Sequence, residues 1–460
     1  MGYGDLILFP VFIFLCSLFF RRLRKKYDDP ILRKYHRQGF WIKMLGCFAF
    51  TIFSVYLSPG DSIGLYQKEG NNIFHFILND WNNVNMILSK GKDFDQTLLK
   101  DPWNHGYFKS EANFMVTRIV VILSFLTFGR YAAINILFAC IAFSGLWKLF
   151  LFFYEQYPHM HKKFAIGILY FPTVVFWSSG ILKDTLCIAS IGWVTYSVYE
   201  LLYRKKSFIK NMMILFVFGY LLAILKVYIL ISYLPFFILF IILKNIQGIK
   251  NKLFKYMLAP ALIFGSMYGF TLVLNSYDQE LGAYAVEDLT KSIQHLNGAI
   301  TSMDGNETAE SNFDLGVEFD GSFKGLIRMA PVAIFTTFYR PFLWESRKLS
   351  SLLASLESLV LLFFTMYVIF KSGLRTFIKL ILTDPLIMYC FLFSLVFALF
   401  VGASTLNFGT LVRYKIPCLP FYTISLFLIF EKVKEKSLKK TLQKAKALAS
   451  PELSLSHCVY

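Results

Sequence analysis

The sequence predicts an all-α, polytopic integral membrane protein, and two observations carry that prediction. Of its 460 residues, 56% are hydrophobic and 18% are aromatic, and the mean hydropathy is +0.53. This is more apolar surface than a water-soluble fold buries. The apolar residues also occur in long unbroken runs, which satisfy their backbone hydrogen bonds in a bilayer as helices rather than as barrel strands.

The number of spans follows from the lengths of these runs, which are about 16 to 24 residues and therefore long enough to cross a bilayer. A further run at 114–128 is bracketed by Arg118 and Arg130, and it predicts a juxtamembrane helix rather than a span. About eleven transmembrane helices are expected, at 5–20, 41–58, 131–154, 163–178, 185–203, 210–226, 228–244, 257–275, 351–370, 385–403 and 416–430.

The basic residues are concentrated in every second connection between spans, as the positive-inside rule describes. The formal net charge of +18 therefore indicates orientation, and no nucleic-acid partner is expected because the cations do not gather on one soluble face. The first basic connection, from Arg21 to Arg37, predicts a cytoplasmic loop. The N-terminus is then expected outside the cytoplasm and the C-terminus inside it.

This orientation places two long connections outside the cytoplasm, and long loops between spans are commonly functional. The second of them is rich in acidic residues. The predicted organisation is a first span with its basic connection (1–40), a transmembrane module with an outer loop and a juxtamembrane helix (41–245, 59–112, 114–128), a second module with the acidic outer loop (246–431, 276–350) and a basic cytoplasmic tail (432–460).

The first two groups of candidate residues follow the second and fourth spans. Asp61 comes directly after a span, so its carboxylate is expected at the membrane surface, where it either acts on a lipid-linked substrate or caps a short helix. Lys183 and Asp184 lie at the next outer turn. They predict either a second functional carboxylate with a cation for phosphate, or a helix cap beside a snorkelling lysine.

The other two groups lie in the C-terminal half. Arg340 and Glu345 end the acidic outer loop, where the arginine either grips a phosphate or belongs to an interfacial aromatic belt. Arg413 and Lys415 are cations on the outer side, against the positive-inside tendency. That departure favours an anion site over snorkelling, and a polyprenyl phosphate or diphosphate is the anion expected at this depth.

Several function classes have no motif in the chain. There is no glycine-rich phosphate loop, Rossmann fingerprint, His-Glu zinc motif or nucleophile elbow, so nucleotide-driven chemistry is not expected. The seven cysteines show no disulfide or zinc spacing. The only cofactor that the outer carboxylates suggest is a divalent cation, Mg²⁺ or Mn²⁺.

The early position of Asp61 and the Lys183-Asp184 pair at the next outer turn make residues 41–245 resemble the GT-C superfamily of polytopic glycosyltransferases. The resemblance implies a polyprenyl-phosphate sugar as donor, a first-loop aspartate as base or metal ligand, and a further acid at the second outer turn. The whole chain also resembles uncharacterised multispanning proteins of Bacteroidetes-type bacteria, which implies a bacterial inner membrane. The runs that carry this second resemblance are 176–180, 340–342 and 413–417.

The leading hypothesis is therefore an inverting glycosyltransferase that acts at the periplasmic face, with membrane lipid and a polyprenyl-phosphate-linked sugar as partners. Asp61 would deprotonate the acceptor hydroxyl. Asp184, with Glu345, would position the acceptor or bind a divalent cation. The residues expected to hold the lipid phosphate are Lys183, Arg340, Arg413 and Lys415.

Three other readings stay open. A polysaccharide polymerase or ligase would depend on the outer arginines and tolerate loss of Asp61. A transporter or lipid flippase would need ionisable residues at mid-bilayer and an internal repeat. A non-catalytic membrane subunit would tolerate neutral replacement of every outer acid.

Overall fold

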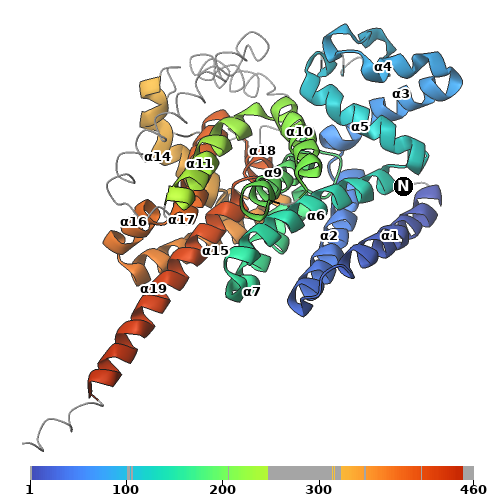
Figure 1. The fold of residues 1–460 in the computed structure, drawn as a ribbon. Helices are drawn as coiled ribbons and strands as arrows, with labels where there is room; N and C mark the ends of the chain where they lie inside the picture. Colours follow the sequence, from blue (N-terminus) through green and yellow to red (C-terminus); the bar gives the residue numbers. More distant parts are fainter. Residues whose placement is uncertain are drawn as a thin grey trace, which may run out of the picture.

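The structure is a computed structural model, and the chain is helical in the part that it describes (Figure 1). Seven of these helices are long and apolar enough to cross a membrane, or eight if one bent helix pair counts as a single span. This confirms the prediction of an all-α polytopic membrane protein. The residues described are 3–100, 104, 107–205, 207–246, 313, 315, 323–346, 349–405 and 407–448.

The N-terminal half is organised around α6, which is apolar on all sides and almost entirely buried, as expected of a helix at the centre of a bundle. Helices α1, α2 and α9 pack directly on it, and α10 packs on α9. The helices of this half are α1 (Tyr3–Arg24), α2 (Pro30–Tyr56), α3 (Lys68–Asn79), α4 (Asn85–Leu88), α5 (Glu111–Thr127), α6 (Tyr131–Gln156), α7 (His161–Phe164), α8 (Pro172–Trp177), α9 (Lys183–Tyr199) and α10 (Phe208–Leu225).

The C-terminal half packs on the first through α19, which contacts the π-helical turn Ala165–Leu169 as well as α15 and α17. Beyond these contacts, α19 continues as a long helix that leaves the bundle (red in Figure 1). The helices of this half are α11 (Val227–Ile246), α14 (Phe323–Tyr339), α15 (Leu349–Ser372), α16 (Leu374–Thr383), α17 (Pro385–Ser404), α18 (Phe408–Tyr414) and α19 (Leu419–Leu448).

Local sequence sets where the spans begin. Asp29 accepts a hydrogen bond from the backbone N–H of Ile31 (2.8 Å), and Pro30 occupies the first helical position of α2. Asp384 and Pro385 begin α17 in the same way. An aspartate cap satisfies a backbone donor that the helix leaves free, and the missing N–H of proline is not needed at that position. The starts of both spans are therefore encoded locally.

One predicted span, 163–178, is not a single helix. The chain is helical from α7 through the turn Ala165–Leu169, breaks at Tyr170 and Phe171, and resumes as the six-residue α8. Phe171 is extended (φ −65°, ψ 116°) because the ring of Pro172 disfavours the helical conformation of the residue before it. The predicted span 257–275 lies outside the described residues.

The described residues between 62 and 127 form a lobe at one end of the bundle (Figure 1). At this end, which we call the Asp61 end, α2 ends and α9 begins. Helices α3 and α5 pack against each other in this lobe. The buried Glu69 carboxylate of α3 accepts hydrogen bonds from Lys100 N (2.9 Å) and Asn104 Nδ2 (2.8 Å), and it therefore holds these two residues of the lobe against α3.

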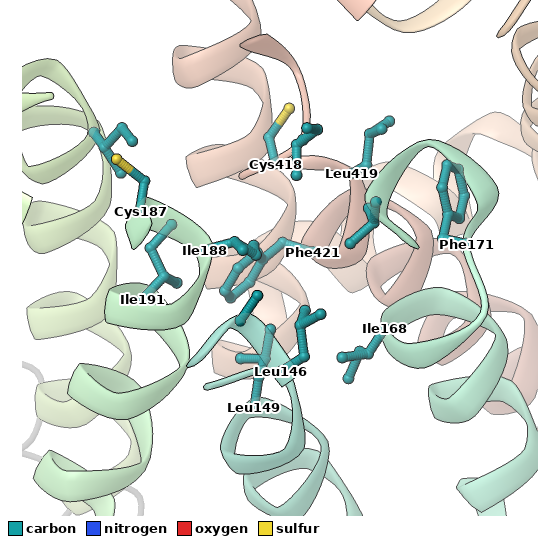
Figure 2. Close-up of a cluster of buried hydrophobic side chains, with 14 of the residues drawn as sticks. Leu146, Leu149, Ile168, Phe171, Cys187, Ile188, Ile191, Cys418, Leu419 and Phe421 are labelled. Carbon is teal, nitrogen blue, oxygen red and sulfur yellow. The ribbon is translucent and has the colours of Figure 1, made fainter. Parts of the chain in front are cut away.

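The two halves of the chain meet in an apolar cluster (Figure 2). It combines Leu146 and Leu149 of α6 with Cys187 and Ile188 of α9, and with Phe421 of α19. All five side chains are almost fully buried. Because Phe421 lies at the start of α19, this packing brings the residues just before α19 next to the first turn of α9.

Close approach of α6 and α9 depends on two glycines that face each other. A Cβ atom on Gly192 would lie 1.9 Å from the carbonyl oxygen of Gly145, and one on Gly145 would lie 2.3 Å from that of Ala189. We expect Gly192→Ala to lower the free energy of unfolding by about 1–3 kcal/mol, because the backbones must separate. Thermal unfolding in detergent measures this effect, with Gly219→Ala as control, since no atom lies within 4 Å of a Cβ there. Equal stability of the two variants would contradict it.

Candidate functional site

Four charged side chains form a continuous chain of ion pairs at the Asp61 end. Lys226 Nζ lies 2.5 Å from Asp184 Oδ1, and Arg413 Nε lies 2.6 Å from Asp184 Oδ2. The Nη1 atom of Arg413 lies 2.9 Å from Asp61 Oδ2. Arg413 therefore bridges two carboxylates that come from distant parts of the sequence.

Each of these residues lies at the end of a helix or in a break between helices. Asp184 is in the first turn of α9, and Lys226 separates α10 from α11. Arg413 is in the last turn of α18, just before the chain bends by 62° into α19, and Asp61 precedes the π-helical turn Ser62–Gln67. Helix ends at one level of the bundle therefore bring the four charges together.

The chain of ion pairs runs from the interior to the surface. The exposed fraction of the side chain is 0% for Asp184, 6% for Lys226, 15% for Arg413 and 48% for Asp61. Both oxygens of Asp184 are held by cations, so this carboxylate is saturated. Asp61 is held on one oxygen only and faces the surface. Of the two carboxylates in this chain of ion pairs, Asp61 is therefore the one that an incoming molecule can reach.

Lys183 belongs to the same group of charges, because it is close enough to interact electrostatically with all four of these residues. We call the set of Asp61, Lys183, Asp184, Lys226 and Arg413 the Asp184 cluster. Its three cations and two carboxylates leave one net positive charge. The cluster is therefore suited to an anion.

The aromatic residues around the cluster limit its access to water. The Lys226 ammonium lies 3.6 Å from the centre of the Tyr414 ring, a cation–π contact that partly replaces hydration. Tyr66 is buried beside Asp61 and donates a hydrogen bond to Asn113 Oδ1 (3.2 Å). Burial, and then the charge of Asp61, raise the pKa of the Tyr66 hydroxyl, so that it stays protonated.

Arg340, predicted to hold the lipid phosphate, and Glu345, predicted to position the acceptor or bind a cation, pair with each other. Arg340 Nε lies 3.0 Å and 3.2 Å from the two carboxylate oxygens of Glu345. The Arg340 guanidinium also lies over the rings of Phe313 (4.7 Å) and Phe408 (5.2 Å). The pair therefore holds the turn after α14 against α18.

Lys415 lies two residues after Arg413 but faces a different environment. It is 1% exposed, and its ammonium donates to Ser358 Oγ (3.0 Å) and to the backbone oxygen of Arg340 (3.3 Å). It also interacts electrostatically with Glu357 of α15. The structure thus brings together Asp61, Lys183, Asp184 and Arg413 of the predicted residues, and it places Arg340, Glu345 and Lys415 in a second group.

The residues predicted from the sequence do not include three charges that are buried or half-buried: Lys43, Lys226 and Glu357. Lys226 is the last residue of the predicted span 210–226, and a charge inside a long apolar stretch is itself a signal of function. Lys43 and Glu357 lie within predicted spans and gave the same signal. The site residue among them, Lys226, was thus detectable from its apolar surroundings.

A divalent cation does not fit the Asp184 cluster, because both of its carboxylates already pair with cations and the net charge is positive. Among the described residues, one group has metal-like geometry: His159, Glu431 and Glu435, at the opposite end. Glu431 is already paired with Lys163 there. The suggested Mg²⁺ or Mn²⁺ therefore has no support at the cluster.

Comparison with known proteins adds no relative, since no family model, curated protein or solved structure matches this chain. Its function is inferred from the geometry above.

Proposed function

We propose that this protein is a membrane glycosyltransferase that moves a sugar from a polyprenyl-phosphate donor to an acceptor hydroxyl at the Asp184 cluster. The observation that supports it most is the 2.9 Å contact between the exposed carboxylate of Asp61 and the guanidinium of Arg413. It sets a proton acceptor directly beside a phosphate-binding cation. Sugar transfer from a lipid phosphate needs both groups at the same place.

The residues then take distinct roles in an inverting transfer. Asp61 accepts the proton of the acceptor hydroxyl while the acceptor oxygen bonds to the anomeric carbon. The bond from that carbon to the phosphate oxygen breaks, and polyprenyl phosphate leaves with both electrons. Arg413 and Lys183 stabilise the charge that develops on the phosphate. Asp184 and Lys226 act indirectly: Asp184 holds the guanidinium of Arg413 by its Nε, and Lys226 pairs with the other oxygen of Asp184. The Nη1 atom of Arg413 stays beside Asp61 at the exposed end of the cluster.

The proposed orientation places this site at the periplasmic face of a bacterial inner membrane, with about eleven spans, the N-terminus outside and the C-terminus inside. The position of the basic tail supports this orientation. Lys434, Lys436 and Lys440 lie on the part of α19 that runs away from the Asp61 end. In such a membrane the Asp184 cluster faces the leaflet in which periplasmic lipid-linked sugars are presented.

The test of this proposal is sugar release from polyprenyl-phosphate donors by the purified protein in liposomes. We expect Arg413→Ala to lower kcat/KM by about 10²- to 10³-fold, because a single charge-stabilising donor contributes that much to the transition state. Arg413→Lys is expected to recover only part of this loss, since an ammonium cannot bind phosphate bidentately. Arg375→Ala on the exposed surface of α16 is the matched control. Unchanged turnover in Arg413→Ala would overturn the proposed role.

A transporter or lipid flippase is the second candidate, and one observation favours it. Lys43 is 2% exposed and is the middle residue of the 27-residue helix α2, which is the kind of intramembrane charge that this class uses. The same liposomes separate the two candidates. Movement of a labelled lipid-linked sugar across the membrane without release of the sugar would support the transporter.

A further inference from the structure

The short helix α8 is held at both ends by ionisable side chains of opposite sign, a half-buried glutamate and a buried lysine. At its N-terminal end, Oε2 of Glu357 from α15 accepts a hydrogen bond from the backbone N–H of Thr173 (2.8 Å). At its C-terminal end, Nζ of Lys43 from α2 donates to Ser178 Oγ (2.5 Å) and to the backbone oxygen of Val175 (3.4 Å). Free N–H and carbonyl groups at helix ends need partners when they are buried. The backbone oxygen of Val175 also accepts from Ser179 Oγ, so Lys43 adds a second donor to it.

Burying Lys43 to supply these hydrogen bonds has a high free-energy cost. A buried lysine within a span is costly, and in the described part of the chain Lys43 forms no ion pair with a carboxylate. An apolar side chain at this position would avoid the cost of burying the charge. The lysine therefore indicates a requirement that packing alone does not meet. Because both of its acceptors lie at the C-terminal end of α8, we infer that this requirement is to fix the position of that end.

The buried turn 178–182 connects the end of α8 to the first turn of α9, which holds Lys183 and Asp184 of the Asp184 cluster. The backbone N–H of Ile181 donates to Asn135 Oδ1 (3.0 Å), and Thr185 Oγ1 donates to the backbone oxygen of Gly180 (2.6 Å). Gly180 itself lies against Phe50, where a Cβ would come within 1.9 Å of the ring. The chain from Ser178 to Leu182 is entirely buried, so a shift of α8 displaces the first turn of α9.

We propose that Lys43 and Glu357 are positioning residues, which hold α8 between α2 and α15 and thereby set Lys183 and Asp184 in the cluster. The effect of this positioning role on sugar transfer rests on the proposed function. Its effect on the first turn of α9 does not. Neither residue touches the reacting groups. They act through the turn 178–182.

The first turn of α9 carries a natural probe, because Cys187 lies one turn after Asp184 and is fully buried. We expect Lys43→Met to raise the rate at which N-ethylmaleimide labels Cys187 on the order of tenfold, since local opening governs the reactivity of a buried group. Mass spectrometry assigns the labelled cysteine. Cys390 of α17 is equally buried and reports global loosening, so its labelling should not change.

Three further variants complete the experiment. Lys43→Arg keeps the donor and should leave Cys187 protected. Glu357→Gln keeps an acceptor oxygen, so Cys187 should stay better protected in this variant than in Glu357→Leu. Lys148→Met is the matched control, because the ammonium of this partly buried lysine lies against the Tyr196 ring (4.3 Å). In the donor assay, Lys43→Met should lose about 10²-fold in kcat/KM, as expected for a misplaced catalytic group.

Each outcome of this experiment decides a separate question. The positioning role would be overturned if Cys187 stays protected from labelling in Lys43→Met and Glu357→Leu. It would also be overturned if the labelling rates of Cys187 and Cys390 rise equally. Increased labelling of Cys187 with unchanged sugar transfer would support the positioning of α9 and contradict its effect on transfer. A wild-type protein inactive on every donor would count against the proposed function alone, because Cys187 labelling and its rescue by Lys43→Arg still decide the positioning of α9.

Discussion

Replacing Asp61 with asparagine is expected to lower the turnover of sugar transfer by about 10²- to 10⁴-fold, the usual contribution of a positioned general base. The amide has the size of the carboxylate and still accepts a hydrogen bond from Arg413, but it cannot take a proton at neutral pH. Because the Asp61 side chain is 48% exposed, its ion pair adds only about 0–1 kcal/mol to stability. The variant should therefore insert and unfold like the wild type.

The measurement compares Asp61→Asn with Asp93→Asn, an exposed aspartate in the same lobe. Loss of transfer in the first variant and full activity in the second would support Asp61 as the base. An active Asp61→Asn beside an inactive Arg413→Ala would instead indicate a polymerase or ligase that depends on phosphate binding alone. Full activity in both would leave Asp61 without a role in the transfer, whereas a wild-type protein that transfers no sugar would be expected of a non-catalytic subunit.

Removing Asp184 should have the largest effect on stability. Asp184→Leu leaves Lys226 and Arg413 buried with one carboxylate fewer, and breaking a buried ion pair from one side destabilises a protein by about 3–5 kcal/mol. Lys226→Met should cost less, because Arg413 still neutralises Asp184. Thermal and denaturant unfolding in the same detergent provide the comparison.

A double-mutant cycle tests whether the cost is electrostatic. Asp184→Asn together with Lys226→Met removes one charge of each sign, so the double variant should be more stable than the sum of the two single effects predicts. A difference within about 0.5 kcal/mol of additivity would contradict the coupling. Transfer activity should stay low in the double variant, because Arg413 loses the carboxylate that holds its Nε.

The helices could be predicted from the sequence because their signals are local. Apolar length, an aspartate cap and a proline at the first position suffice for α17. The same signals are present at the start of α2, but the predicted span 41–58 begins later, because the first turns of that helix are basic. The break before α8 was also encoded, in Pro172, but it was missed because the apolar run continues through it. Hydropathy alone does not show where a helix stops when both sides of the break are buried.

The sequence by itself determined the membrane class and the charged residues at the ends of apolar runs, including Asp61, Asp184 and Arg413. Only the tertiary structure decided which of them share a site. Arg413 and Lys415 are two residues apart, and at 3.6 residues per turn their side chains leave the helix about 200° apart. One therefore meets Asp184 and the other meets Ser358. The partners across each interface depend on how α9, α11, α15 and α18 pack, and no local pattern encodes that packing.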